Sequence, residues 1–235
     1  MSLDPGLSGR TDVDQALVEM TAADLAAAGR VLAGEGLVGP FGQVSVRLTP
    51  EAFLITAPVP LDRAAAAELA VVIDVRAAAL PAGAPAEGHL HAAVYRARPD
   101  VQAVCRAQPQ AAQAVAASNR PLRLLHGHGV LAGSSVPVVD DARLIRTRER
   151  AVAVADRLGD ASGLLLRGNG AVTVGRSLGA AVARMWALEA SAQLNLPLLG
   201  LHEVRELDAQ EIAHWSAMAD ELLGRIWAHL RARHV

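Results

Sequence analysis

A carboxylate and an imidazole stand one helical turn apart near the middle of the chain. Glu87 follows a loop rich in proline, glycine and alanine, and His91 comes four residues later in a segment that Pro99 ends. On a helix this spacing places both side chains on one face. A carboxylate there can move a proton during catalysis. Glu87 is therefore a candidate acid or base, and His91 is a candidate to orient it or to contact a substrate. The alternatives are a helix cap and a core histidine.

Histidine also occurs in two His-x-His pairs, which are His89 with His91 and His126 with His128. Neutral imidazoles are common zinc ligands, so a metal site built from these four residues is one alternative. Against it, residues two apart on a helix do not face one another.

The elements that must position these groups follow from the spacing of apolar residues and from turn residues. Helices are predicted at 14–34, 87–98, 109–118, 143–158, 178–194 and 209–233. Strands are predicted at 41–47, 52–56, 69–75, 101–106, 164–167 and 171–174, with further strand segments inside 122–139. This irregular alternation predicts an α/β fold, a single-domain three-layer α/β/α structure with a mixed central sheet over residues 14–235. Residues 1–13 are expected to form a flexible arm.

Composition limits the class of protein. The chain has 235 residues, of which 52% are hydrophobic and 20% charged, which is typical of one globular domain with its own core. A net charge of −2 gives no reason to expect nucleic acid as a partner. The single cysteine, Cys105, excludes an intramolecular disulfide and fits a cytoplasmic location. We expect no membrane partner, because no apolar run approaches the roughly 20 residues that span a bilayer.

Several segments resemble the class II aldolase/adducin family. The stretch at 87–104, EGHLHAAVYRARPDVQAV, is similar to its central motif, and 41–47 (FGQVSVR) and 164–178 (LLLRGNGAVTVGRSL) match further segments in the same order. The resemblance covers about residues 14–195 and implies a class II aldolase-like fold. It also implies a catalytic glutamate at Glu87 and a homotetramer with its pockets between subunits.

The chain departs from this family where the metal should bind. The family's three metal-binding histidines correspond here to Arg106, Gln108 and Asn169. Arginine has no lone pair to donate, and amide oxygens are poor zinc ligands, so we expect no metal cofactor. A guanidinium can instead hold a carboxylate or an enolate oxygen, with the two amides as further donors. This predicts a catalytic set of Glu87, Arg106, Gln108 and Asn169.

The resemblance also implies which residues contact a substrate. Gln43 and Ser45 lie in the segment that lines the family's pocket, Thr56 lies in a second pocket loop, and His91 is on the helix of Glu87. Pro85 and Ala86 replace the hydroxyl residues that help the family's aldolases hold phosphate, which argues against a sugar phosphate. We therefore expect a metal-independent lyase-type enzyme, a decarboxylase, aldolase-like enzyme or isomerase, acting on a small carboxylated or carbonyl substrate. The alternative is a non-catalytic, adducin-like binding or assembly module.

Overall fold

The computed structural model describes residues 13–63 and 70–235. The expected arm, apart from residue 13, and Leu69 of the strand predicted at 69–75 lie outside the described residues. The strands are β1 (Gln43–Arg47), β2 (Ala52–Thr56), β3 (Ala70–Asp74), β4 (Ala103–Ala107), β5 (Val138–Val139), β6 (Gly163–Leu166) and β7 (Gly170–Gly175). The helices are α1 (Gln15–Gly34), α2 (Gly88–Ala97), α3 (Gln110–Ala117), α4 (Gly127–Ala132), α5 (Arg148–Leu158), α6 (Leu178–Asn195), α7 (Ala209–Ala217) and α8 (Ala219–His234). Two 3₁₀ helices are η1 (Leu61–Arg63) and η3 (Leu196–Leu198).

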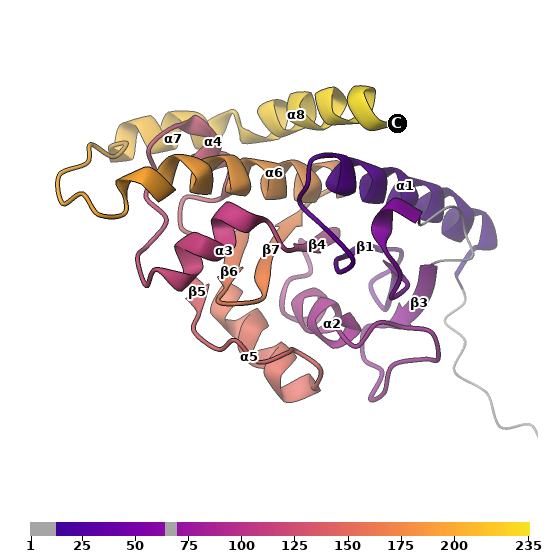
Figure 1. Ribbon diagram of the computed structural model, residues 1–235. Helices are drawn as coiled ribbons and strands as arrows, with labels where there is room; N and C mark the ends of the chain where they lie inside the picture. Colours follow the sequence, from indigo (N-terminus) through magenta and orange to yellow (C-terminus); the bar gives the residue numbers. More distant parts are fainter. Residues whose placement is uncertain (1–12, 64–69) are drawn as a thin grey trace, which may run out of the picture.

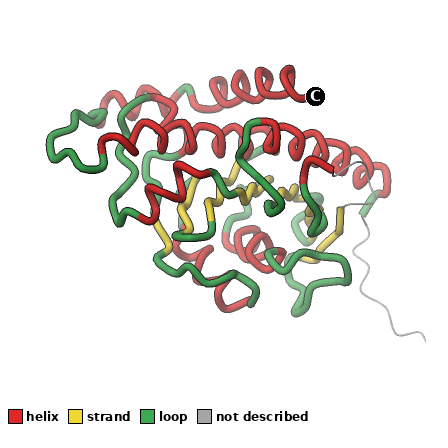
Figure 2. Tube along the Cα trace, viewed as in Figure 1, coloured by secondary structure: helices red, strands yellow, loops and turns green. Residues whose placement is uncertain are grey.

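The strands form one seven-stranded sheet in the order β3-β2-β1-β4-β7-β6-β5. All neighbouring strands are antiparallel except β5 and β6, which are parallel, so the sheet is mixed. Helices α1, α3 and α6 pack against one face, and α2 and α5 cover the other. Figures 1 and 2 show the strands as a layer between these two groups of helices. The expected three-layer fold with a mixed sheet is confirmed.

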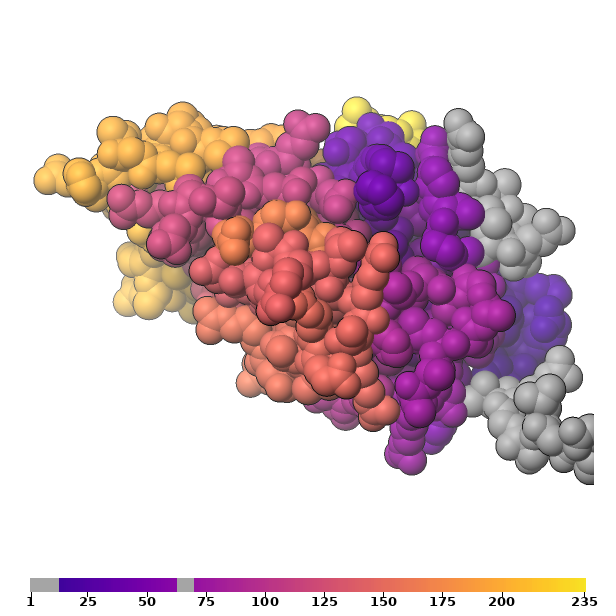
Figure 3. Space-filling view, turned by 60° about the horizontal axis from the view of Figure 1, so that its bottom comes forward, coloured from indigo at the N-terminus to yellow at the C-terminus, as the bar shows by residue number. Residues whose placement is uncertain are grey.

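The two faces of the sheet have separate cores because side chains alternate along each strand. In β4, Ala103, Cys105 and Ala107 point into the core under α1 and α6, whereas Val104 points toward α2 and α5. Figure 3 views the molecule from the side of α2 and α5, whose segments adjoin over the sheet. The C-terminal helix α8 packs outside α1 and α6. Among the described residues, no helix is both long enough and apolar enough to cross a membrane.

Three predicted elements differ from the structure. The segment at 122–139 holds helix α4 and the short strand β5, where strand segments around a glycine-rich turn were expected. The helix predicted from residue 143 begins at Arg148, and the helix predicted at 209–233 is broken at Met218 into α7 and α8. The remaining predicted helices and strands occur within a few residues of their expected bounds.

Candidate active site

Arg106 is the buried cation of the central strands. It lies in β4 opposite Gln43 of β1 and Val172 of β7, and its side chain is 2% exposed. By alternation it points toward α2, the same side as Val104. Burial lowers the pKa of Arg106 below its ordinary value, and the negative charge of Glu87 opposes only part of this shift. Arginine stays protonated in proteins, so a positive charge is held inside the domain. Among the described residues, no carboxylate lies within 4.0 Å of it.

Asn169 is fixed against Arg106 by a tight turn. The turn joins β6 to β7, and Asn169 is 4% exposed. Nη2 of Arg106 donates to the Asn169 side-chain oxygen and also to its backbone oxygen, at 3.2 Å. Gly170 has a φ of +91°, and a Cβ there would lie 2.0 Å from the backbone oxygen of Ala107. Only glycine lets the backbone of the turn pass so close to β4, and this close passage places Asn169 beside Arg106.

Three buried polar atoms near Arg106 have no hydrogen-bond partner among the described residues. They are Nε of Arg106, Oε1 of Gln43 and Nε2 of His91. Gln43 is 6% exposed and His91 is fully buried. His91 is hydrogen-bonded to Ser45, which lies two residues after Gln43 in β1, and Gln43 is paired with Arg106, so His91 and Arg106 lie on the same side of the sheet. Buried polar groups are nearly always paired, so three orphans on one side of the sheet indicate a place for a polar ligand.

His91 is held by a hydrogen-bond chain that runs through Ser45 to Tyr95. The Ser45 hydroxyl lies 2.6 Å from His91 Nδ1 and 2.8 Å from the Tyr95 hydroxyl. Burial raises the pKa of Tyr95, so the phenol stays protonated, and Ser45 is its side-chain partner among the described residues. If Tyr95 donates to Ser45, the serine proton points to Nδ1 of His91. Nε2 of His91 then carries the ring proton and is a buried, unused donor.

His91 is neutral in this environment. Burial, and secondarily the positive charge of Arg106, lowers its pKa to about 3. If His91 oriented Glu87, a hydrogen bond between their side chains would be expected, but the described residues show none. Their one hydrogen bond is between backbone atoms, at 3.3 Å. His91 is instead oriented by Ser45.

Glu87 and Gln108 are the two half-buried residues of the predicted catalytic set. Glu87 precedes α2, is half-buried and makes no capping bond through its side chain. Its carboxylate acts electrostatically on Arg106. Gln108 follows β4 and is half-buried, with its backbone N–H bonded to the oxygen of Leu37. Because side chains alternate along an extended chain, the Gln108 side chain points to the same side of the sheet as the Arg106 side chain.

Thr56 is not brought together with these residues. Its neighbour Ile55 packs on the side of α2, so Thr56 points to the opposite side of the sheet. Its hydroxyl accepts a hydrogen bond from the N–H of Val44 at 3.1 Å, which ties the end of β2 to β1. Thr56 therefore stabilises the pairing of β1 with β2 and is not part of the proposed site.

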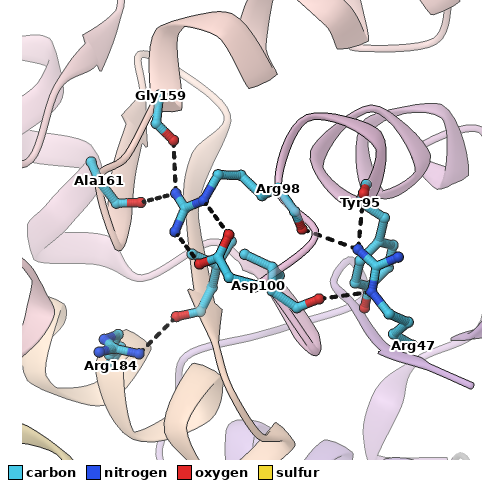
Figure 4. Close-up of polar contacts among 9 residues, drawn as sticks. Arg47, Tyr95, Arg98, Asp100, Gly159, Ala161 and Arg184 are labelled. Atoms are coloured by element: carbon cyan, nitrogen blue, oxygen red, sulfur yellow. Dashed lines mark hydrogen bonds and ion pairs between the residues drawn. The ribbon is translucent and has the colours of Figure 1, made fainter. Parts of the chain in front are cut away.

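Arg47 anchors the C-terminal end of α2, a role that was not predicted from the sequence. The guanidinium donates to the backbone oxygens of Tyr95 and Arg98 at 2.9 and 3.1 Å (Figure 4). It also donates to the backbone oxygen of Val101 at 2.9 Å. It also lies 4.6 Å from the centre of the Tyr95 ring. Arg98 in turn pairs with Asp100 (Figure 4). Ser45 and Arg47, two residues apart in β1, therefore hold Tyr95 from both ends. Tyr95 could have been found from its spacing of four residues after His91.

The donors at these positions do not fit the divalent ion that the resemblance implied. Arg106 offers a positive charge and no lone pair, and the side-chain oxygen of Asn169 already accepts from Arg106. A relocated histidine site fits no better, because His91 points from α2 toward Ser45 of β1, whereas His128 of α4 packs against Trp186 of α6 on the other side of the sheet. The described residues contain no group of three or more side chains of the types that hold metal ions.

Comparison with known proteins agrees with this fold. The family description "Class II Aldolase and Adducin N-terminal domain" matches residues 23–196. A 3,4-dihydroxyphthalate decarboxylase from Arthrobacter keyseri is 31% identical over 190 residues, which is 73% of this chain and 76% of that protein. A protein of the same name from Rhodococcus jostii (strain RHA1) is 28% identical over 243 residues, 95% of this chain and 97% of that protein. The solved structure of an aldolase II superfamily protein from Pseudomonas syringae is 25% identical, with a TM-score of 0.77 over 94% of each chain. The expected family is confirmed: the chain belongs to the class II aldolase/adducin family.

Proposed function

We propose that the chain is a metal-independent decarboxylase that acts on a small aromatic carboxylate with neighbouring hydroxyl groups. The observation that carries this proposal is Arg106, a buried guanidinium with an unused Nε and no paired carboxylate among the described residues. A carboxylate ligand would supply the missing counter-charge. The relatives named 3,4-dihydroxyphthalate decarboxylase support the substrate class.

The residues divide the work as follows. Arg106 and the Nε2–H of His91 donate to substrate oxygens and stabilise the negative charge that develops there. Asn169 orients the guanidinium, and Gln43 accepts from a substrate hydroxyl. Glu87 delivers a proton to the ring carbon that carries the departing carboxylate. The bond between that carbon and the carboxyl carbon breaks, CO₂ leaves, and the proton takes its place on the ring.

The proposed assembly is a homotetramer. A site at a subunit interface would further cover Glu87 and Gln108, whose side chains are half-buried in the single chain. We propose the tetramer because the resemblance to the family implies it.

The test is CO₂ release from 3,4-dihydroxyphthalate by the wild type and by Arg106→Lys. Lysine keeps the charge but loses the planar pair of donors, so we expect kcat to fall by about a hundredfold or more. Arg157→Lys is the matched control, because Arg157 is an exposed arginine on α5, away from β4. It should leave the rate unchanged.

Circular dichroism and the unfolding midpoint must show that Arg106→Lys still folds. An Arg106→Lys protein that is folded and retains the wild-type rate would exclude the role given to the guanidinium. Complete absence of CO₂ release by the wild type would exclude this substrate and leave the binding-module alternative.

A further inference from the structure

A cavity that is partly open to solvent lies on the other side of the sheet, between α4, α6 and the two C-terminal helices. Its volume is about 340 Å³, within the roughly 300–1,000 Å³ typical of small-molecule sites. α4 contacts both α6 and α7 there (Figure 1). None of the residues proposed for the decarboxylase site lines this cavity. A ligand bound there would therefore be separate from the reaction.

Two indole rings form part of the wall. Trp186 comes from α6 and Trp215 from α7. Trp215 is seated on α4, since a Cβ at Gly127 would lie 2.2 Å from its ring. The ring of His128 stands edge-on to Trp186 at 5.3 Å between centroids. Leu131 completes an apolar surface that suits a flat aromatic ring.

One face of α8 adds a positive charge to this wall. Leu222, Arg225, Ile226 and His229 follow the spacing of one helix face and all line the cavity. Arg225 makes no ion pair and no side-chain hydrogen bond among the described residues. A guanidinium at the edge of an aromatic cavity selects a planar carboxylate, which it can bind through two parallel hydrogen bonds.

We propose that this cavity, which we call the tryptophan cavity, is a binding site for a small aromatic carboxylate. The ring lies against Trp186 and Trp215, and the carboxylate pairs with Arg225. The neutral surface provided by Leu131, Leu222 and Ile226 excludes water from the ring. The site stands independently of the proposed decarboxylase activity.

Intrinsic tryptophan fluorescence tests the proposal, because two of the three tryptophans line the cavity. Benzoate is the probe, and benzamide, which has the same ring and no charge, is the comparison ligand. Trp227→Phe removes the third tryptophan, which lines a different groove. We expect benzoate to change the emission of Trp227→Phe protein with saturation, and benzamide to bind at least about tenfold more weakly.

Three variants locate the binding. Arg225→Gln should weaken benzoate binding about tenfold. Arg231→Gln, an exposed arginine on the same helix that lies outside the cavity, should not change it. Arg106→Lys reports on the proposed decarboxylase site and should also leave the signal unchanged.

Several results would overturn the proposal. Benzoate that produces no saturable change, or an Arg225→Gln protein that binds like the wild type, would show that the cavity does not hold the ligand. Loss of the signal in Arg106→Lys alone would place the binding at the other site. Emission that changes with protein concentration and not with benzoate would show that a second copy of the chain covers the cavity.

Discussion

His91 shows how one residue links the stability of the fold to the state of the site. Its folded pKa is about 3, because it is buried and lies near the charge of Arg106, against 6.5 for an exposed histidine. The unfolded chain therefore binds a proton between these two values that the folded chain does not. The contribution of neutral His91 to the free energy of unfolding is fully present above pH 6.5 and is lost as the pH falls toward 3.

We predict that His91→Asn flattens this dependence. Asparagine can still accept from Ser45 through its side-chain oxygen but does not titrate. Below pH 6.5 the free energy of unfolding of the wild type should fall by about 1.4 kcal/mol more per pH unit than that of the variant. Urea unfolding at several pH values measures this, with His202→Asn, an exposed loop position, as control. Equal slopes for wild type and His91→Asn would mean that His91 titrates normally.

At the scale of elements, the turn between β6 and β7 sets the position of Asn169. Gly170→Ala would place a Cβ 2.0 Å from the oxygen of Ala107 and force an alanine into a φ of +91°. We predict a loss of about 2 kcal/mol or more in unfolding free energy. Gly224→Ala is the matched control in α8, where a Cβ meets nothing within 4 Å, and should stabilise by about 0.5–1 kcal/mol.

Denaturant unfolding of both glycine variants gives the comparison. If Gly170→Ala were as stable as the wild type, the turn could move away from β4, and the contact between Asn169 and Arg106 would not depend on it.

The elements that local patterns specify were predictable, and those that tertiary contacts specify were not. α2 ends near Pro99 as expected, because proline interrupts the helical hydrogen bonds. The strands predicted at 164–167 and 171–174 leave only residues 168–170 between them, so a tight turn was expected between β6 and β7. By contrast, the His-Gly-His-Gly run at 126–129 has low helix propensity, yet it forms the start of α4. Gly127 and Gly129 are packed too closely against Trp215 and Ser191 for a Cβ, and these partners lie far away in the sequence.

The candidate site divides in the same way. The resemblance predicted the positions of Arg106 and Asn169, and the structure brings their side chains into contact. Nothing in the sequence showed that Ser45 would join His91 to Tyr95, because that chain depends on which face of β1 meets α2. Thr56 was predicted together with Ser45, but it lies on the opposite side of the sheet because β2 is paired with β1 in a particular register.

At the scale of the whole molecule, one carboxylate fastens the end of the chain to the domain. Glu35 follows α1 and accepts from Trp186 of α6 at 3.1 Å and from Arg233 and His234 of α8 at 2.8 and 2.6 Å. Burial raises its pKa, but the bonds from these three residues outweigh burial and lower it overall. The attachment is therefore present above the ordinary pKa of 4.5 and weakens as the pH falls below it.

We predict that Glu35→Gln loosens the end of α8 without unfolding the domain. The amides at 228–235 should exchange with solvent faster, because an uncharged amide binds Arg233 and His234 more weakly. Hydrogen exchange read by mass spectrometry measures this, and Glu221→Gln, an exposed acidic position on the same helix, is the control. Unchanged exchange at 228–235 in Glu35→Gln would show that apolar packing alone holds α8.

In the proposed function, Arg106 takes the place of the metal ion that the family resemblance implies. The most direct measurement is the rate of CO₂ release from 3,4-dihydroxyphthalate by chelator-treated protein, purified without a metal-binding tag, with its metal content determined on the same sample. We predict full activity at a metal content far below one ion per chain, and no increase when zinc, manganese, iron or cobalt is returned. Activity that disappears with the metal and returns in proportion to one ion per chain would contradict the account.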